Sequence, residues 1–195
     1  MIRKRAEAGF SVAELLFVLA VVSAIAAMAM PTFSDVHVRR LESASSELIA
    51  ALQFARQESI RTGIPHGVRR ITGQNQVAVF HLDMTSNPPV EVYDLSHPVD
   101  RTPKYQIAFD NHPHARGTKV LAHFRIYTGG SDEAISFNAR GEPIQGTTGL
   151  PLRRAYGGFL LNNGDYGLVV SVSRLTGRIF AGEIGGTESD PLVVF

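Results

Sequence analysis

The chain has 195 residues, a length that suits one domain with an appendage. Its 19 lysines and arginines nearly balance its 18 aspartates and glutamates, which excludes a strong overall field attracting nucleic acid. The absence of cysteine excludes thiol catalysis, thiolate metal sites and disulfides, so the stability of the fold must come from an ordinary hydrophobic core.

A short basic leader precedes a long apolar run. In residues 1–9, three basic side chains (Arg3, Lys4 and Arg5) stand against Glu7. Residues 10–31 are almost entirely apolar and predict a membrane-spanning helix, because a helix of about 20 residues spans about 30 Å. Basic residues before such a span tend to stay in the cytoplasm, which sends the rest of the chain outward.

One carboxylate, Glu14, lies at the edge of this apolar run. A charge in a membrane segment costs roughly 2 to 3 kcal/mol on insertion scales, so Glu14 is a candidate functional residue. A secretory signal peptide is the alternative interpretation, and the alanine-rich residues 24–29 would offer it a cleavage site. The apolar region of a signal peptide is uncharged, however, and Glu14 argues against this interpretation.

Residues 32–62 predict a second, amphipathic half of the same helix. Pro31 is expected to kink the helix between the two halves. Thr62-Gly63 followed by Pro65 is a stop signal. Apolar residues recur at spacings of three and four, which indicates one buried face: Leu41, Ala44, Leu48, Leu52 and Ala55. Polar residues fill the other faces: Arg39, Arg40, Glu42, Glu47, Arg56, Gln57 and Glu58.

Residues 63–195 predict a globular domain of antiparallel strands. Asn162-Asn163-Gly164-Asp165 and Leu175-Thr176-Gly177 are turn signals that indicate two hairpins. Residues from about 85 to 116, which hold five prolines, indicate an irregular insertion. The fold class is therefore α+β, with a long N-terminal helix packed on an antiparallel β-sheet domain. The predicted strands are Gln76–Leu82, Val90–Tyr93, Lys119–Tyr127, Ala134–Phe137, Gly158–Leu161, Tyr166–Ser173 and Arg178–Ile184.

Other polar clusters invite functional interpretations that the sequence does not favour. Four histidines, His97, His112, His114 and His123, lack the tight spacing of a metal motif and are interpreted as loop histidines. The sequence therefore predicts no metal, no cofactor and no catalytic residue. Three charged pairs are interpreted as solvated faces or turn flanks: Arg69-Arg70, Asp132-Glu133 and Arg153-Arg154.

The sequence Gly9-Phe10-Ser11-Val12-Ala13-Glu14 resembles the processing site of type IV pilins and pseudopilins. The resemblance implies that a prepilin peptidase cuts between Gly9 and Phe10 and methylates the new amino group of Phe10. It also implies that Glu14 pairs with the Phe10 amine of a neighbouring subunit, and that Pro31 is the helix-kinking proline usual in these proteins.

Three later segments are similar to the GspH/FimT subgroup of minor pseudopilins: residues 48–63, 135–141 and 176–179. This resemblance implies a structural, non-enzymatic subunit of a type II secretion pseudopilus or a type IV pilus. Its partners would be the prepilin peptidase, the bacterial inner membrane and other pseudopilins of the same filament. The chain would cross the inner membrane once, with its C-terminal domain in the periplasm.

Two alternative functions stay open at this point. The first is an envelope domain, anchored by a single helix, that binds a ligand by itself; Glu14 argues for the filament instead. The second is a DNA-binding minor pilin for competence, which rests on Gly177-Arg178. Some FimT-like proteins carry a second basic residue two places further on, where this chain has Phe180, so nucleic acid is not an expected partner.

Overall fold

The computed structural model describes residues 11–29, 33–99, 101–122, 134–152 and 156–186. The chain divides into two compact units, Met1–Val36 and His37–Phe195. Each unit contributes one part of the helical N-terminal third, and the strands of the described residues all lie in the second unit.

The helix of the first unit is α1 (Val12–Ala29). Its first turn is capped by Ser11, whose hydroxyl oxygen accepts a hydrogen bond from the Ala13 N–H at 3.3 Å. Among the described residues, no helix is both long enough and apolar enough to span a membrane. The predicted span of residues 10–31 includes positions 10, 30 and 31, which lie outside the described residues.

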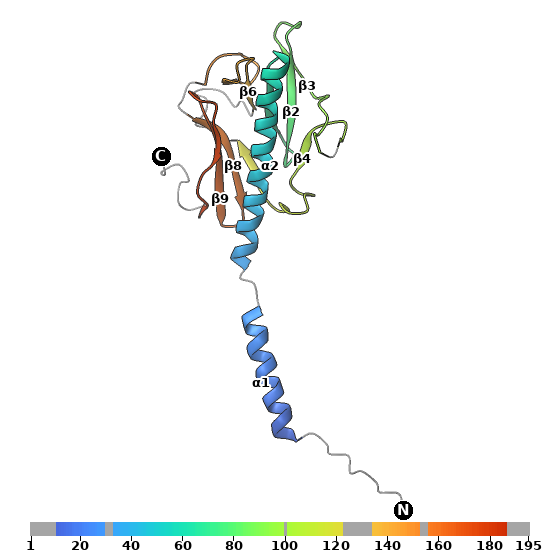
Figure 1. The fold of residues 1–195 in the computed structure, drawn as a ribbon, viewed down its shortest axis with the longest axis vertical. Coiled ribbons are helices and arrows are strands. Elements are labelled where there is room, and N and C mark those ends of the chain that lie inside the picture. The colour runs from blue at the N-terminus through green and yellow to red at the C-terminus, as the bar shows by residue number, and fades with distance from the viewer. Residues whose placement is uncertain (1–10, 30–32, 100, 123–133, 153–155, 187–195) are drawn as a thin grey trace, which may run out of the picture. The chain divides into compact units, whose positions relative to one another are not determined.

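Helix α2 (Phe33–Thr62) buries one face against the strands of the second unit, as its apolar periodicity predicted. Figure 1 shows α2 lying along the junction between two groups of strands. The helix ends where Gly63 adopts a left-handed backbone conformation (φ +73°) and donates from its N–H to the Ser59 carbonyl at 3.0 Å. Its fully buried apolar side chains are Leu41, Ala44, Leu48, Ala51, Leu52 and Ala55.

The first group of strands is a six-stranded antiparallel sheet with the order β3-β2-β1-β6-β7, in which β4 also pairs with β2. The β1–β2 pair sets the register, with Val68 opposite Val79, so that both side chains reach the core under α2. The strands are β1 (His66–Ile71), β2 (Gln76–Asp83), β3 (Val90–Val92), β4 (Gln106–Ala108), β6 (Ala134–Phe137) and β7 (Pro143–Gln145).

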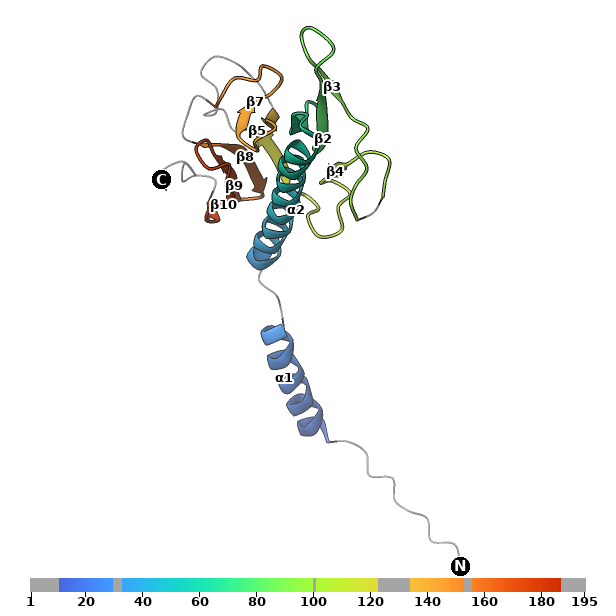
Figure 2. The same cartoon turned by 45° about the horizontal axis from the view of Figure 1, so that its top comes forward.

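The second group is a five-stranded antiparallel sheet with the order β10-β9-β8-β5, in which β11 pairs with β9 (Figure 2). Strands β8 and β9 form the hairpin predicted at Asn162–Asp165, and Gly164 supplies the positive φ (+63°) of its turn. The strands are β5 (Lys119–Ala122), β8 (Tyr156–Asn163), β9 (Tyr166–Ser173), β10 (Ile179–Ala181) and β11 (Gly185–Gly186).

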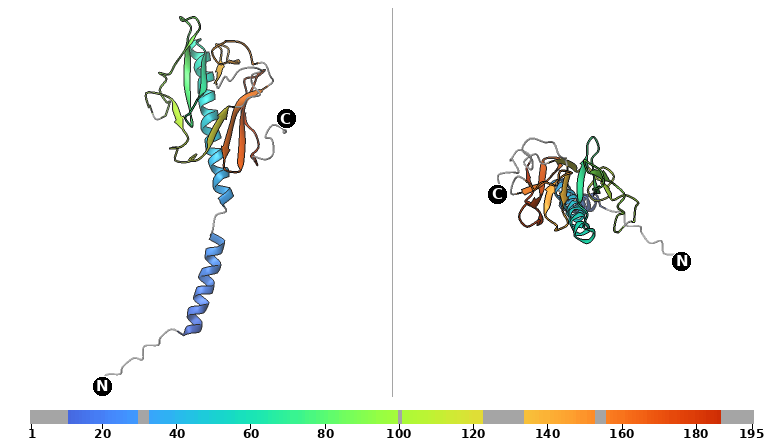
Figure 3. Two further views of the ribbon diagram at one scale, coloured as in Figure 1. Left: turned by 180° about the vertical axis from the view of Figure 1, so that it is seen from behind. Right: turned by 90° about the horizontal axis from the view of Figure 1, so that it is seen from above.

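The main core lies where both sheets meet α2, and seen from behind the two sheets lie on either side of the helix (Figure 3). Three phenylalanines from different parts of the chain fill it: Phe109, Phe137 and Phe159. A smaller cluster of Phe80, Leu82 and Ala134 is covered by Tyr93. The antiparallel α+β fold is thus confirmed, and the strands divide into two sheets.

Most predicted strands coincide with observed ones, but four strands were missed: β1, β4, β7 and the two-residue β11. Strand β1 carries two arginines, and β4 and β7 have three residues each, so none of them shows a clear alternation of apolar and polar residues. Strand β4 also lies inside the segment predicted to be irregular. The predicted strand Lys119–Tyr127 begins as β5, and its residues from 123 onward lie outside the described residues.

Candidate functional site

Glu14 is the one predicted assembly or processing residue that the structure describes; Gly9, Phe10 and Pro31 lie outside the described residues. Glu14 is exposed in the first turn of α1, and its N–H donates to the Ser11 carbonyl at 3.0 Å. Ser11 and Glu14 have the spacing of a capping box, in which a serine and a glutamate three residues later together satisfy the helix start. A carboxylate at this position is also favoured by the helix dipole. The helix dipole therefore favours Glu14 at the start of α1, whatever its predicted role between subunits.

Arg56, which the sequence placed only among the polar residues of α2, joins the end of this helix to both sheets. Its Nε donates to the Gly141 carbonyl oxygen at 3.0 Å, and its Nη2 donates to the Thr176 carbonyl oxygen at 3.2 Å. Gly141 precedes β7 in the first sheet, and Thr176 lies in the turn between β9 and β10 of the second. A guanidinium can serve two acceptors at once because its donors form a planar fork.

The two glycines beside Arg56 leave room for its guanidinium. Gly141 has φ +75°, and a Cβ there would lie 2.8 Å from the Ile60 Cδ1 atom. Gly177 has φ +63°, and a Cβ there would lie 2.8 Å from the Gly141 carbonyl oxygen and 3.2 Å from the Arg56 Cζ. Both the backbone conformation and the close approach therefore require glycine.

The Arg56 contacts bring together the three segments that carry the GspH/FimT resemblance. Residues 48–63 supply Arg56, residues 135–141 end at Gly141, and residues 176–179 begin at Thr176. In the β6–β7 turn, the Asn138 side chain accepts hydrogen bonds from the N–H groups of Arg140 (2.9 Å) and Glu142 (3.0 Å). These segments thus form a structural junction of the fold.

The prediction that Arg69 lies on a solvated face is wrong. Its guanidinium, one quarter exposed, makes a bidentate ion pair with Glu91 of β3. The Tyr93 hydroxyl also donates to this carboxylate, and burial raises the Tyr93 pKa. A pair of this geometry fixes the register of β3 and β1 on either side of β2. The other predicted surface pairs, Asp132-Glu133 and Arg153-Arg154, lie outside the described residues.

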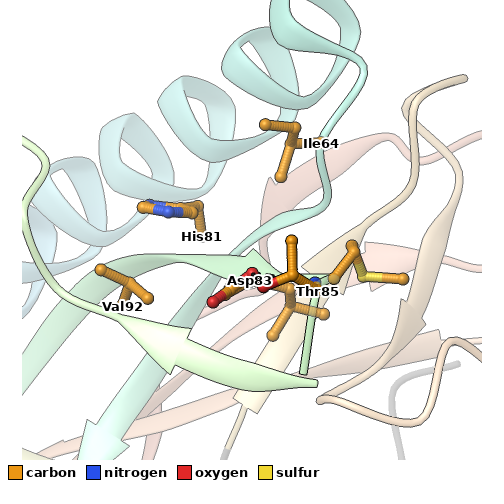
Figure 4. Close-up of a pocket in the computed structure, with 7 residues that line it drawn as sticks. Ile64, His81, Asp83, Thr85 and Val92 are labelled. Carbon is orange, nitrogen blue, oxygen red and sulfur yellow. Dashed lines mark hydrogen bonds between the residues drawn. The ribbon is translucent and has the colours of Figure 1, made fainter. Parts of the chain in front are cut away.

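A cavity of about 270 Å³ lies at the C-terminal end of α2. Figure 4 shows Ile64 from the α2–β1 connection above His81, Val92, Asp83 and Thr85. The Asp83 carboxylate accepts hydrogen bonds from the hydroxyl (2.7 Å) and N–H (2.9 Å) of Thr85, and these bonds lower the Asp83 pKa. His81 Nδ1 lies 3.1 Å from the Asp94 carboxylate. The polar groups that line this cavity are thus engaged in local contacts.

His66 lies beside this cavity and fastens β1 to the end of α2. Its N–H donates to the Ser59 hydroxyl at 2.9 Å, and this hydroxyl donates to the Ala55 carbonyl at 2.9 Å. The His66 Nδ1 donates to the Ile64 carbonyl oxygen at 2.7 Å, and its ring lies 5.8 Å from the His81 ring. Burial lowers the pKa of the His66 imidazole, which is therefore neutral at pH 7.

Two histidines of the insertion line a second, larger cavity of about 620 Å³. His97 and His112 line it, and the His112 and His114 rings are 6.3 Å apart. Among the described residues, no three histidine, aspartate or glutamate side chains are placed to hold a metal ion. His123 lies outside the described residues.

The DNA-binding alternative rests on Gly177-Arg178, and these two residues belong to the turn that enters β10. The Arg178 guanidinium carbon lies 6.0 Å from the centre of the Phe180 ring, which in turn packs edge-on against Tyr156. Arg178 is thus a single cation stacked on an aromatic side chain.

Comparison with known proteins adds three observations. Residues 44–176 match the family described as Type II transport protein GspH. The fold is similar to the type IV minor pilin FimU of Pseudomonas aeruginosa, with 19% identity and a TM-score of 0.46, over 73% of this chain and 88% of that one. It is also similar to the minor pseudopilin EpsH from the type 2 secretion system of Vibrio cholerae, with 11% identity and a TM-score of 0.47, over 73% of this chain and 96% of that one.

No curated protein gave a significant match to the sequence. The family assignment therefore rests on the match over residues 44–176, which spans most of α2 and the strands as far as the β9–β10 turn. It contains the first two segments that meet at Arg56 and ends at Thr176, the first residue of the third. This chain belongs to the GspH family of type II transport proteins.

Proposed function

We propose that this chain is a minor pseudopilin, a non-catalytic structural subunit of a type II secretion pseudopilus or a type IV pilus. The observation that carries the proposal is the family match over residues 44–176. In this role, the subunit contributes its N-terminal helix to a filament and its strands to the filament surface.

The first step of this function is processing of the leader. A prepilin peptidase removes residues 1–9 by cutting between Gly9 and Phe10 and then methylates the Phe10 amine. The sequence supports this step, because a small Gly9 lets an enzyme approach the backbone closely. The cleaved chain would then begin one residue before Ser11, the cap of α1.

The second step is anchoring in the inner membrane by residues 10–31, with the second unit in the periplasm. Large apolar side chains of α1 are between 51% and 70% exposed: Leu15, Leu16, Phe17, Val18, Leu19, Val22 and Ile25. Lipid, or the same helix of neighbouring subunits, would remove this apolar surface from water, which is favourable by about 25 cal/mol per Å².

The third step is assembly, in which Glu14 pairs with the Phe10 amine of a neighbouring subunit. Opposite charges attract strongly where water is excluded, because the interaction grows as the dielectric constant falls. Glu14 is exposed at the helix start and is free of any basic partner within 4.0 Å among the described residues. A neighbouring amine would provide that partner.

The test is to express the tagged chain in cells that contain the prepilin peptidase and the other filament subunits. We expect a product shortened by the leader that copurifies with the sheared filament, whereas Gly9→Leu should leave an uncut precursor in the membrane. An uncut wild-type chain, or a processed one that never copurifies with filament subunits, would contradict the proposed function. A chain with Gln57→Ala, a change at an exposed position of α2, is the control for expression.

A further inference from the structure

His66 and His81 place two imidazole rings side by side on the face of the first sheet that α2 covers. The two residues lie directly opposite each other in the antiparallel β1–β2 pair. They are two positions from Val68 and Val79, which reach the core under α2, so all four side chains share one face of the sheet. The centres of the two histidine rings are 5.8 Å apart.

One nitrogen of each ring is already held by a hydrogen-bond acceptor. His66 Nδ1 lies 2.7 Å from the Ile64 carbonyl oxygen, and His81 Nδ1 lies 3.1 Å from the Asp94 carboxylate. Because a carbonyl oxygen and a carboxylate oxygen can only accept, Nδ1 carries the proton in both rings. In the neutral form of each ring, the lone pair is therefore on Nε2.

The two Nε2 atoms are open to an incoming group. Neither atom has a hydrogen-bond partner within the described part of the chain. Neither atom is among the described buried side-chain atoms that lack a partner, so both keep some surface accessible to solvent. The His81 side chain as a whole is 22% exposed. The pair thus presents two accessible lone pairs on one face of the sheet.

This arrangement is the one that proteins use around the histidine ligands of metal ions. A ligating histidine almost always donates its other ring N–H to a carboxylate or a backbone carbonyl, which fixes the tautomer and the orientation of the ring. A metal ion lies about 2.1 Å from the nitrogen and about 3.2 Å from the ring centre, so two rings that share one ion have centres within about 6.4 Å. The separation of 5.8 Å between His66 and His81 satisfies this limit.

We propose that His66 and His81 bind one divalent transition-metal ion through their Nε2 atoms, with water completing the coordination. Among the described residues, no third histidine, aspartate or glutamate joins the pair. Glu58 of α2, whose charge acts on His66, is held in an ion pair by Arg61. Two neutral imidazoles suit Cu²⁺, Ni²⁺ and Zn²⁺, and the general order of complex stability makes Cu²⁺ the tightest.

The bound ion would fasten β1 to β2 beneath the last turns of α2. His66 also donates from its N–H to the Ser59 hydroxyl, so the metal site and the end of the helix share one residue. A ligand that binds only the folded chain stabilises it, and we therefore expect the ion to raise the melting temperature. This inference goes beyond the filament role proposed above and does not depend on it.

The test titrates Cu²⁺ into the full chain in detergent at pH 7.5, followed by calorimetry and electron paramagnetic resonance. The chain has no cysteine, so no thiolate competes for the ion. We expect one tightly bound ion with two imidazole nitrogens in its spectrum. His81→Asn should weaken binding by more than about 100-fold, whereas Asp94→Asn should weaken it about tenfold, because this carboxylate only orients the ring. His66→Asn, whose amide can still donate to the Ile64 carbonyl, should match His81→Asn.

The matched control is His114→Asn, at an exposed position of the insertion. It breaks up a second close pair of rings, in which His112 buries its Nδ1 and directs its Nε2 toward Glu47. This variant should keep the wild-type affinity and the rise in melting temperature. Binding that survives both His66→Asn and His81→Asn, or that falls as much with His114→Asn, is adventitious and overturns the proposal. A spectrum with a single imidazole nitrogen, or an ion that leaves the melting temperature unchanged, also overturns it. If His66→Asn does not fold, the result with the partly exposed His81 decides.

Discussion

The Arg56 guanidinium donates to the Gly141 carbonyl oxygen at 3.0 Å across a sequence separation of 85 residues. Its second bond, to Thr176, spans 120 residues. One side chain of α2 is therefore hydrogen-bonded to a turn of each sheet. This junction brings a charged residue, two glycines and a threonine together from segments that are far apart along the chain.

Replacing Arg56 should loosen this junction. We expect Arg56→Ala to lower the free energy of unfolding by about 2 to 3 kcal/mol, because two backbone carbonyls lose a charged donor. Arg56→Lys should recover only part of this loss, since an ammonium on a flexible chain does not reproduce the fork. Chemical unfolding followed by circular dichroism measures both. The exposed neighbour Gln57→Ala is the control and should change stability by less than about 0.5 kcal/mol. Equal stability of Arg56→Ala and Gln57→Ala would contradict the junction.

Strand β8 should not tolerate a side chain at Gly158. A Cβ there would lie 1.9 Å from the Val170 carbonyl oxygen of β9, so the two strands would have to separate. We expect Gly158→Ala to destabilise the protein by at least about 3 kcal/mol, the upper range for overpacking. Gly167→Ala in β9 is the matched control, because its Cβ would meet nothing closer than 3.7 Å. Thermal unfolding should separate the two variants clearly, and similar melting temperatures would refute the predicted clash.

Stability should depend on pH through His66. Burial lowers its pKa below the ordinary 6.5, so the unfolded chain binds a proton more readily than the folded one. The stabilisation is complete above a pH of about 6.5 and is lost as the pH falls through the folded pKa, by about 1.4 kcal/mol for each pKa unit. Melting temperatures from pH 8 to 5 should therefore fall more steeply for the wild type than for His66→Asn. His114→Asn, at an exposed position, should keep the wild-type slope.

The two roles of Glu14 can be separated by two substitutions. Glutamine keeps the capping-box geometry at the start of α1 but removes the charge, whereas alanine removes both. If Glu14 pairs with a neighbouring amine, both variants should be processed normally, and both should be equally defective in filament assembly. Rescue of assembly by Glu14→Gln alone would show that helix capping is the role of this residue. The readouts are the size of the processed chain and its amount in sheared filaments.

Most of the successful predictions rest on local sequence patterns. The stripe from Leu41 to Ala55 repeats with the helical period, and Asn162–Asp165 is a turn signal contained in four residues. Such features depend on neighbours in the sequence. Strands β1, β4 and β7 were missed because these segments form strands only through pairing with other strands. Strand β1 lies between β2 and β6, and this pairing buries Val68 although two arginines follow it in the sequence.

The sequence by itself determined that the helical part precedes the strands and which face of α2 is buried, because periodicity and turn chemistry are local. It also placed the Gly9-Phe10 junction and Glu14, whose roles between subunits stay predictions. Only the tertiary structure decided what Arg56 and Arg69 do. A surface arginine and a junction arginine look alike along the chain, and the difference lies in partners brought close by folding: Gly141 for Arg56 and Glu91 for Arg69.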